Sequence, residues 1–298
     1  VRRLGLGALN QVALAPDGRT LAIAALAGVW LQNGDLTTFL DTGSEVTAVA
    51  FSPDGSLLAA GLRGGEVQVW RWQGGFEQVA RLQGHSGAVR GIGFFGSGQR
   101  LASISTDGSA RAWRIEDSSQ AWVKQASDKP LAALAVDEAN NRLAVGGEDR
   151  FAHTLNLDSG EPAGTPANFS EPITALAFSP SDPQLLAIGG KLGNVGYWSL
   201  YRNNALARIS LLSEVTALSF GPDPNGQPSL RIASLDPAMW VYYASPQLEQ
   251  STGAVRVLPF AVAVVRLVVE HHDVPEPHEL RHHALEHLPL GLQRLERR

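Results

Sequence analysis

Residues 278–287, HELRHHALEH, include side chains that could bind a metal ion. The segment from His278 to His282 fits the HExxH pattern of zinc peptidases, in which two His four residues apart on a helix share the ion and Glu279 acts as general base. A catalytic zinc also needs a third protein ligand in a surrounding fold. Only 16 residues follow His282. We therefore predict no catalytic metal site, and His278 and His282 stay weak candidates for adventitious metal binding.

A second set of residues has the types found in a serine hydrolase, namely Ser103, His85 and Asp107. No G-x-S-x-G sequence surrounds Ser103, so there is no sign of the strained turn and oxyanion hole of that enzyme class. The stretch Gly189-Gly190-Lys191 lacks the GxxxxGK[ST] spacing of a phosphate-binding loop. We therefore predict no catalytic residue and no cofactor.

Composition narrows the class of protein. The net charge of −5 and the pI of about 5.9 disfavour a nucleic-acid or anionic-membrane partner. The longest apolar run, 257–269, is interrupted by Pro259 and Arg266 and is too short to span a bilayer. We expect a soluble protein and favour the cytoplasm, although the absence of Cys does not decide the compartment. The chain begins with Val1, and we expect from this a fragment, a processed product or an unusual start codon.

An internal repeat fills most of the chain, and the elements that it forms would position the residues of any site. The copies resemble VAFSPDGSLLAAG, residues 49–61, and each has an apolar marker residue just before a turn. The markers are Leu14, Phe51, Phe94, Val136, Phe178 and Phe220. The steps between them are 37, 43, 42, 42 and 42 residues. A period of about 42 residues is typical of a propeller blade.

Each copy predicts four short strands. In the second copy an alternating apolar run, 46–51, leads into the turn Ser52-Pro53-Asp54-Gly55. Pro presets φ in such a turn and Gly accepts a positive φ. Further apolar runs follow at 57–61, 67–70 and 76–82. The pattern predicts an all-β protein, a β-propeller of four-stranded antiparallel blades, with six legible blades and the start of a seventh.

The repeats resemble the WD-repeat family. The third copy carries the motifs best: Gly84-His85, Leu101-Ala102-Ser103, Thr106-Asp107-Gly108 and Ala112-Trp113-Arg114. The resemblance implies that His85, Ser103, Asp107 and Trp113 form the hydrogen-bonded structural tetrad of that family. It also implies a seven-bladed ring in the intact parent protein.

The remaining copies depart from the family pattern, and the dipeptide Trp-Asp does not occur. In three copies we assign the Trp position to Gln32, Leu155 and Tyr242. In the second copy Thr42 replaces the His. The repeats are therefore degenerate, of a bacterial type, and their blades must rely mainly on apolar packing. The resemblance covers roughly residues 8–260.

The sequence pattern of the repeats ends near Phe260. Residues 253–260, GAVRVLPF, echo GAVRGIGF at 87–94, so a seventh blade begins on schedule. We predict a propeller domain over 1–260 and an atypical tail over 261–298, either a strand followed by a helix or disordered. Six of the eight His lie between 271 and 287. Such a composition shift would also arise from a shifted reading frame, and the sequence leaves open whether the tail is native.

The resemblance implies a non-enzymatic scaffold that binds a protein or peptide through loops on one propeller face. Candidate contact residues in those turns are Arg63, Glu148, Arg150, Lys191, Asp236 and Trp240. The alternatives are a hydrolase with a site in the propeller channel and metal binding by the C-terminal tail. The identity of the partner and the face that it uses stay open.

Overall fold

The structure is a computed structural model, and its chain divides into two units, Gly5–Val262 and a second made of Val1–Leu4 with Ala263–Arg298. It describes residues 10–34, 36–72, 75–222, 228–235 and 241–244, all of which belong to the first unit. The predicted start of the seventh blade and the tail after residue 260 lie outside the described residues. The boundary predicted at residue 260 therefore stays a prediction.

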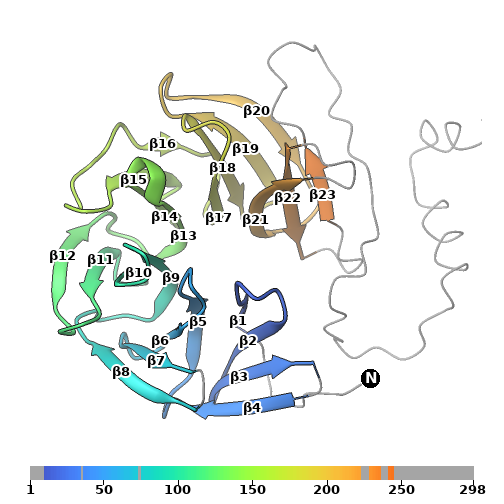
Figure 1. The fold of residues 1–298 in the computed structure, drawn as a ribbon. Coiled ribbons are helices and arrows are strands. Elements are labelled where there is room, and N and C mark those ends of the chain that lie inside the picture. Colours follow the sequence, from blue (N-terminus) through green and yellow to red (C-terminus); the bar gives the residue numbers. More distant parts are fainter. Residues whose placement is uncertain (1–9, 35, 73–74, 223–227, 236–240, 245–298) are drawn as a thin grey trace, which may run out of the picture. The chain divides into compact units, whose positions relative to one another are not determined.

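The described residues form six antiparallel sheets in chain order (Figure 1). The first three sheets contain β1 (Gln11–Leu14), β2 (Thr20–Ala25), β3 (Gly28–Asn33), β4 (Leu36–Asp41), β5 (Val46–Phe51), β6 (Leu57–Leu62), β7 (Val67–Arg71), β8 (Glu77–Leu82), β9 (Val89–Phe95), β10 (Arg100–Ser105), β11 (Ser109–Arg114) and β12 (Gln120–Gln125). The next three contain β13 (Leu131–Asp137), β14 (Arg142–Gly147), β15 (Phe151–Asn156), β16 (Ala167–Asn168), β17 (Ile173–Phe178), β18 (Leu185–Gly190), β19 (Asn194–Ser199), β20 (Asn204–Ser210), β21 (Val215–Pro222), β22 (Pro228–Ser234) and β23 (Val241–Ala244).

Strands within every sheet follow one another in chain order, so each sheet is a simple meander. The first five sheets have four strands and the sixth has three among the described residues, since the chain after β23 lies outside them. First strands of successive sheets pack together from β1 to β21. The predicted fold class, a propeller of antiparallel blades, is confirmed.

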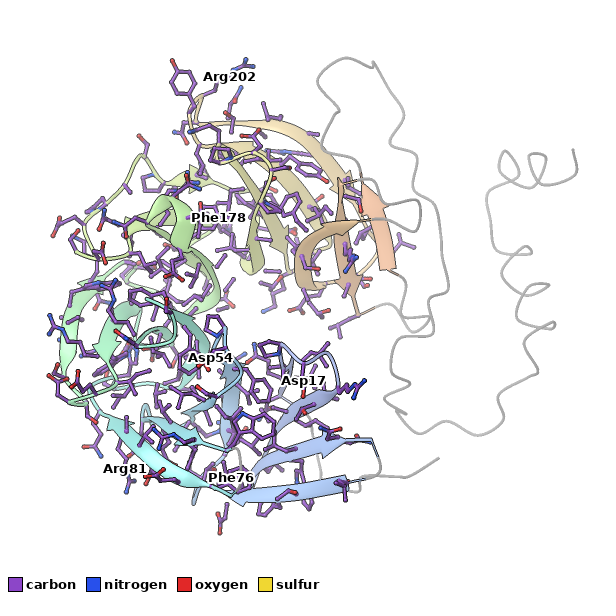
Figure 2. The ribbon with its side chains drawn as sticks, in the orientation of Figure 1. Asp17, Asp54, Phe76, Arg81, Phe178 and Arg202 are labelled. Carbon is purple, nitrogen blue, oxygen red and sulfur yellow. The ribbon has the colours of Figure 1, made fainter. Side chains whose placement is uncertain are left out.

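Short hydrogen-bonded turns explain why the strands begin and end where they do. Asp17 accepts hydrogen bonds from the backbone N–H groups of Arg19 and Thr20 at 2.7 and 2.9 Å, and Gly18 takes a φ of 67°. Asp54 lies in the corresponding turn of the second sheet (Figure 2) and accepts from the Ser56 N–H at 3.0 Å. Asp side chains favour such turns because they satisfy the free N–H groups that follow them.

The hydrophobic core lies between the sheets. The described residues contain five buried clusters, and each joins two consecutive sheets. The cluster between the second and third sheets, for example, combines Val69 and Leu82 with Leu101 and Trp113. Phe178 adds a cation–π contact between the fourth and fifth sheets (Figure 2), because its ring lies 5.1 Å from the guanidinium carbon of Arg142. The sheets therefore stabilise one another in series.

Strand pairing corrects one prediction about the sixth sheet. Trp70 and Trp113 pair with Leu58 and Leu101 of their second strands. The residue of β23 that pairs with the corresponding leucine, Leu230, is Ala244. The prediction that Tyr242 takes the Trp position was wrong. The turn between β22 and β23 is longer than in the second sheet, so counting by period misplaced the third strand.

The helical content of the described residues is a single 3-10 turn, η1 (Glu138–Asn140). No helix in this part of the chain has the length and apolarity needed to cross a membrane.

Candidate functional site

One recurring backbone hydrogen bond gathers the turns and the connections between sheets onto one face. In five sheets the residue after the second strand donates its N–H to the carbonyl of the residue before the first strand. The pairs are Arg63 to Glu45, Thr106 to Ala88, Glu148 to Pro130, Lys191 to Pro172 and Leu235 to Glu214, at 2.9–3.0 Å. We call this surface, made of the second-to-third-strand turns and the connections 42–45, 83–88, 126–130, 169–172 and 211–214, the connection face.

In the third, fourth and fifth sheets a second set of backbone bonds joins the turn to the connection that leaves the same sheet. Gly108, for example, accepts from the N–H of Ser127 at 3.1 Å and has a φ of 79°. A Cβ at Gly108 would lie 2.2 Å from the Ser127 carbonyl oxygen, so only glycine fits this close approach. The turns and connections of the connection face are therefore held rigidly together.

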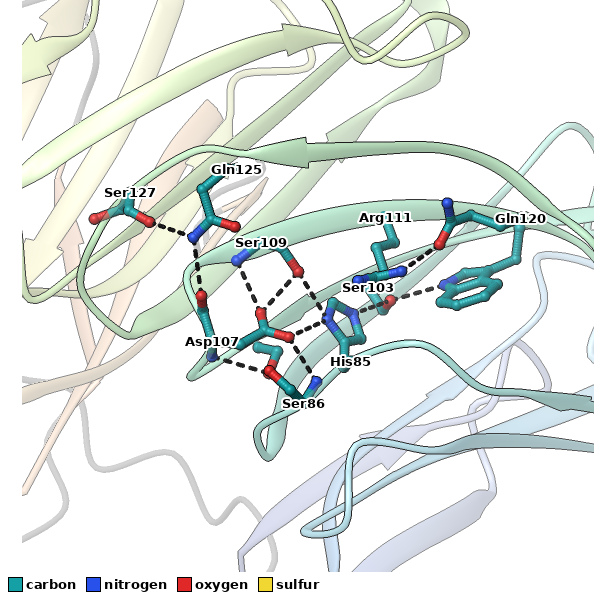
Figure 3. Close-up of polar contacts among 11 residues, drawn as sticks. His85, Ser86, Ser103, Asp107, Ser109, Arg111, Gln120, Gln125 and Ser127 are labelled. Carbon is teal, nitrogen blue, oxygen red and sulfur yellow. Dashed lines mark hydrogen bonds and ion pairs between the residues drawn. The ribbon is translucent and has the colours of Figure 1, made fainter.

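Beneath this face, the structure brings together the four side chains of the predicted tetrad (Figure 3). Trp113 donates its indole N–H to Ser103 Oγ at 2.8 Å. Ser103 Oγ lies 2.8 Å from His85 Nε2, and His85 Nδ1 lies 3.2 Å from an Asp107 carboxylate oxygen. Ser109, which the motif did not predict, joins the network: its hydroxyl donates to Asp107 at 2.7 Å.

The direction of the hydrogen bonds follows from the inventory of donors. An indole N–H can only donate, so Ser103 Oγ accepts from Trp113. Its own proton is then free for His85 Nε2, which leaves the imidazole proton on Nδ1, facing the Asp107 carboxylate. The arrangement satisfies three buried polar side chains at once, and it joins β10, β11 and the connection 83–88.

Ionisation of the network follows from burial and hydrogen bonding. Burial raises the pKa of Asp107, but hydrogen bonds from the Ser109 hydroxyl, the Ser109 N–H and the Ser86 N–H, together with His85, outweigh it and lower the pKa to about 2. Burial also lowers the pKa of His85, more than the neighbouring Asp107 raises it. At neutral pH the pair is thus a neutral imidazole beside a carboxylate.

This order of Ser, His and Asp matches a catalytic triad in its hydrogen bonds, but not in its accessibility. Ser103 is 0% exposed, and the side chain of His85 is also 0% exposed. The indole N–H of Trp113 already occupies the Ser103 oxygen. A substrate carbonyl cannot reach that oxygen, so the geometry gives no support to nucleophilic catalysis by Ser103.

The fourth sheet uses the same Asp position differently. Asp149 there lies 2.7 Å from His153 Nε2, a residue of its own third strand rather than of a connection. In the second sheet Thr42 takes the His position, and its hydroxyl donates to the Ser44 carbonyl at 2.7 Å. Polar contacts near the connection face therefore vary from sheet to sheet, while the backbone bonds described above persist.

Several predicted contact residues lie on the connection face and pair with neighbours. Arg63 forms a bidentate ion pair with Glu45, whose pKa the Arg63 hydrogen bond lowers. The Lys191 amine lies 3.6 Å from a Glu148 oxygen, which links the turns of the fourth and fifth sheets. Both side chains are about half exposed, so this ion pair is available to a partner and contributes little to stability.

Arg150 is exposed and has a φ of 69°, a left-handed conformation at the end of its turn. The remaining two predicted contact residues, Asp236 and Trp240, lie outside the described residues. So do His278 and His282. In the part of the chain that the structure describes, no group of three or more His, Asp or Glu side chains could hold a metal ion.

Sequence reasoning missed three exposed leucines on the connection face. Leu192 is 72% exposed, Leu212 99% and Leu235 62%. Leu211 donates its N–H to the Gly193 carbonyl at 2.8 Å, and Leu235 donates its N–H to the Glu214 carbonyl. The connection 211–214, which contains Leu212, therefore lies between the turn of Leu192 and the turn of Leu235. A leucine in a turn, where a polar residue is usual, is the signal that could have found them.

Comparisons with known proteins identify the repeats. The family profile described as WD domain, G-beta repeat matches residues 34–71 and 76–114. SEC12-like protein 2 of Arabidopsis thaliana is 31% identical over 205 residues, which are 65% of this chain and 51% of that protein. Protein FIZZY-RELATED 2 of Arabidopsis thaliana is 28% identical over 253 residues, 82% of this chain and 52% of that protein.

A further relative, telomerase protein component 1 of Mus musculus, is 25% identical over 211 residues, which are 69% of this chain and 8% of that protein. The chain thus spans at most about half the length of these three relatives. They come from a mammal and a plant and give no support to the bacterial type that the degenerate repeats suggested.

Among solved structures, a chain of the crystal structure of the mitotic checkpoint complex superposes with a TM-score of 0.71 at 22% identity, over 80% of this chain and 73% of that chain. The likeness extends to the fold and agrees with the six sheets described above. The matched profile and the strand order agree: the chain contains WD repeats at residues 34–71 and 76–114, and its described sheets fold as a β-propeller.

Proposed function

We propose that this protein is a non-enzymatic scaffold that binds a protein or peptide through its connection face. The observation that carries the proposal is the rigid series of turns and connections, which presents exposed side chains on a fixed frame. Binding at such a face costs little ordering entropy, because the backbone is already held in place.

Support also comes from what the face exposes. Apolar side chains surrounded by charged ones are the composition of a protein-binding surface, with a desolvated centre and a polar rim. The described residues that we propose to contact the partner are Arg63, Glu148, Arg150, Lys191, Leu192, Leu212 and Leu235. Asp236 and Trp240 are proposed with them from the sequence alone.

A catalytic role has no support in the buried Ser103–His85–Asp107 network, because no substrate can approach it. One relative is a protein component of telomerase, and the solved neighbour is a chain of the mitotic checkpoint complex. Membership of a larger assembly in these similar proteins is consistent with a binding role here.

The test is quantitative affinity capture with three forms of the full chain, of which the first is the wild type. One form carries Leu192→Asp and Leu212→Asp on the connection face. A matched control carries Tyr201→Asp, because Tyr201 is 84% exposed in the turn between β19 and β20, at the opposite ends of the strands. We expect at least one protein to be retained by the wild type and the Tyr201 control and lost by the leucine variant.

Thermal unfolding of both variants must match the wild type, since exposed side chains contribute little to the core. If every captured protein binds all three forms equally, or if the Tyr201 variant alone loses binding, the connection face is not the binding surface and the proposal is wrong.

A further inference from the structure

We propose that the outer edge of β4 pairs with β4 of a second copy of this chain, so that two four-stranded first sheets join into one continuous sheet. The pairing is antiparallel and symmetric, with Phe39 of each copy at its centre. This inference concerns self-association and does not depend on the function proposed above. It follows from a comparison of the outer strands of the described sheets.

β4 is the last strand of the first sheet, and among the described residues no other strand pairs with its outer side (Figure 1). Alternate backbone N–H and C=O groups of such a strand point away from the sheet. A row of these groups is a template for a further strand, so proteins usually protect an edge with bulges, charged side chains or a short strand. The other outer strands have these protections, and β4 lacks them.

Bulges interrupt the pairing of three other outer strands. The register shifts between β7 and β8, between β11 and β12 and between β19 and β20, at Val69/Trp70, Ala112/Trp113 and Tyr197/Trp198. β16 is protected differently, because it has only two residues. β4 pairs with β3 without a shift, in six consecutive pairs from Gly28↔Asp41 to Asn33↔Leu36. Its edge is therefore regular over its whole length, without the bulge that turns an edge away from a second strand.

Charged side chains also distinguish the outer strands. β8, β12 and β20 each carry a cation inside the strand, namely Arg81, Lys124 and Arg208. β4 has one charged residue, Asp41, and it is the last of the strand. The interior, residues 36–40, reads LTTFL, in which Thr and Phe favour strands. Of the described outer strands, β4 alone combines full length, regular pairing and an uncharged interior.

The sequence of β4 is suited to pairing with itself. In an antiparallel pairing centred on Phe39, that residue faces Phe39 of the second copy, Thr38 faces Leu40, and Thr37 faces Asp41. Aromatic pairs directly opposite each other stabilise a sheet, and no like charges face each other in this register. A pairing centred on Thr38 would face each Phe39 with Thr37 and lose the aromatic pair. We therefore choose the register centred on Phe39.

Phe39 is already held in place for this contact. Its ring centroid lies 4.6 Å from that of Trp30, the residue with which it pairs on β3. A Cβ at Gly28 would lie 2.9 Å from a carbon of the Phe39 ring, so the ring also rests against the backbone of β3. Phe39 is nevertheless 37% exposed. The pairing extends this aromatic row across the junction and costs little side-chain entropy, because the ring is already packed.

A symmetric contact of this kind stops at two copies. Each copy has one such edge among its described strands, and an isologous pairing occupies both edges at once. The contact covers the edge of one strand, so it is smaller than a standard protein interface. We therefore expect a weak dimer that forms and dissociates with protein concentration.

Charges at residue 37 test the pairing and its register together. Thr37 is half-buried and faces Asp41 of the second copy in the proposed register. Thr37→Lys puts opposite charges across the junction at two symmetric places, and Thr37→Asp puts like charges there. Sedimentation equilibrium of the full chain at low ionic strength measures the Kd of the dimer. We expect the Kd of Thr37→Asp to exceed that of Thr37→Lys by about tenfold, because both cross-strand pairs change sign.

The matched controls are Val123→Lys and Val123→Asp, because Val123 is 48% exposed on β12, an outer strand with a bulge. We expect both to have the Kd of the wild type. High salt should remove the difference between the two Thr37 variants, since it screens exposed charges. A chain that stays monomeric at its highest soluble concentration overturns the proposal. A dimer with the same Kd in both Thr37 variants at low ionic strength also overturns it.

Engineered cysteines report the register directly, because the chain contains no Cys. Phe39→Cys places two thiols opposite each other, where the Cα atoms are about 5.5 Å apart, a distance typical of disulfides. Thr38→Cys places them diagonally, about 8 Å apart, which is too far for a bridge. We expect disulfide-linked dimers from Phe39→Cys and at least several-fold fewer from Thr38→Cys. An equal or larger yield from Thr38→Cys overturns the proposal.

Amide hydrogen exchange separates a second copy from other occupants of the edge. We expect exchange in β4 to slow as the wild-type concentration is raised through the Kd, while exchange in β12 stays constant. Slow exchange of all β4 amides at every concentration would mean that another segment of the same chain covers the edge. Outward-pointing amides that exchange rapidly at every concentration would mean that the edge stays open. Either result overturns the proposal.

Discussion

The second and third sheets have the same strands and turns but different polar interiors. The third contains the network of Ser103, His85, Asp107 and Trp113. The second keeps Trp70 at the equivalent place, with Ala60 paired where Ser103 stands in the third. Both sheets nevertheless bury their second and third strands equally well. The network is therefore not needed to build a sheet. Packing between neighbouring sheets is what both sheets need.

The difference also shows what the network adds. It ties a connection to β10 and β11 through buried hydrogen bonds, which are strong when complete and costly when one member is lost. The second sheet ties its connection through the exposed pair of Arg63 and Glu45 instead. We expect the third sheet to be more sensitive to single polar changes than the second.

Replacing the buried indole should have the largest effect. Trp113 is 1% exposed and Trp70 is 4% exposed. Truncation of either to Ala should lower the free energy of unfolding by about 3–5 kcal/mol, because it leaves a large cavity. Trp113→Ala should cost about 1–3 kcal/mol more, since Ser103 also loses its donor. Urea unfolding of both variants measures the difference, and equal losses would mean that the network contributes nothing beyond packing.

Removing one hydroxyl tests the network without a cavity. Ser103→Ala should lower the free energy of unfolding by about 1–3 kcal/mol, because the buried indole N–H and the imidazole both lose their partner. The matched change Ala60→Ser introduces a hydroxyl at the equivalent buried place in the second sheet, where Trp70 is present but Thr42 replaces the histidine that accepts the serine proton in the third sheet. We expect it to destabilise too. A stabilising Ala60→Ser would show that the two interiors differ less than their contacts indicate.

Acid should weaken the third sheet through Asp107. Its pKa falls from an ordinary value of 3.8 to about 2 in the folded chain, so the unfolded chain takes up the proton first as pH falls. The stabilisation is present above about pH 4 and is lost as pH falls towards 2, amounting to about 1 kcal/mol once solvent screening is allowed for.

Unfolding measured between pH 5 and 2 should therefore show a shallower loss of stability in Asp107→Asn than in the wild type. The lowered pKa of His85 acts in the same direction at higher pH, since the unfolded chain gains a proton more readily below about pH 6.5. Parallel curves for the wild type and Asp107→Asn would mean that the carboxylate gains nothing from its hydrogen bonds.

The smallest expected effect compares two equivalent threonines. Thr47→Val removes the hydroxyl that bonds to Gly61 and Val89, which should lower the free energy of unfolding by about 0.5–1.5 kcal/mol. Thr216→Val should produce a similar loss if a strand covers the sixth sheet. Thermal melting of both variants checks this, and an unchanged melting temperature for Thr216→Val would argue that its hydroxyl meets only water.

Much of the fold was readable in the chain, because each blade is a local unit. The marker residues, the Pro-Asp-Gly turns and the alternating apolar runs depend on neighbours in sequence, and the observed strands follow them. Four residues of the predicted network came together as the family motif implies, since all of them lie within one repeat. Ser109 was missed because its type alone does not distinguish a buried partner of Asp107 from a solvated turn residue.

Tertiary structure alone decided what happens between repeats. The ion pair of Glu148 and Lys191 joins residues 43 positions apart, and the exposed leucines come from different sheets. The position of Ala244 in the sixth sheet depended on the length of one turn, which a fixed period cannot register. Composition and periodicity determine which residues form a blade. Which surfaces of the blades are covered and which remain open depends on contacts between distant segments, and those exist only once the sheets pack together.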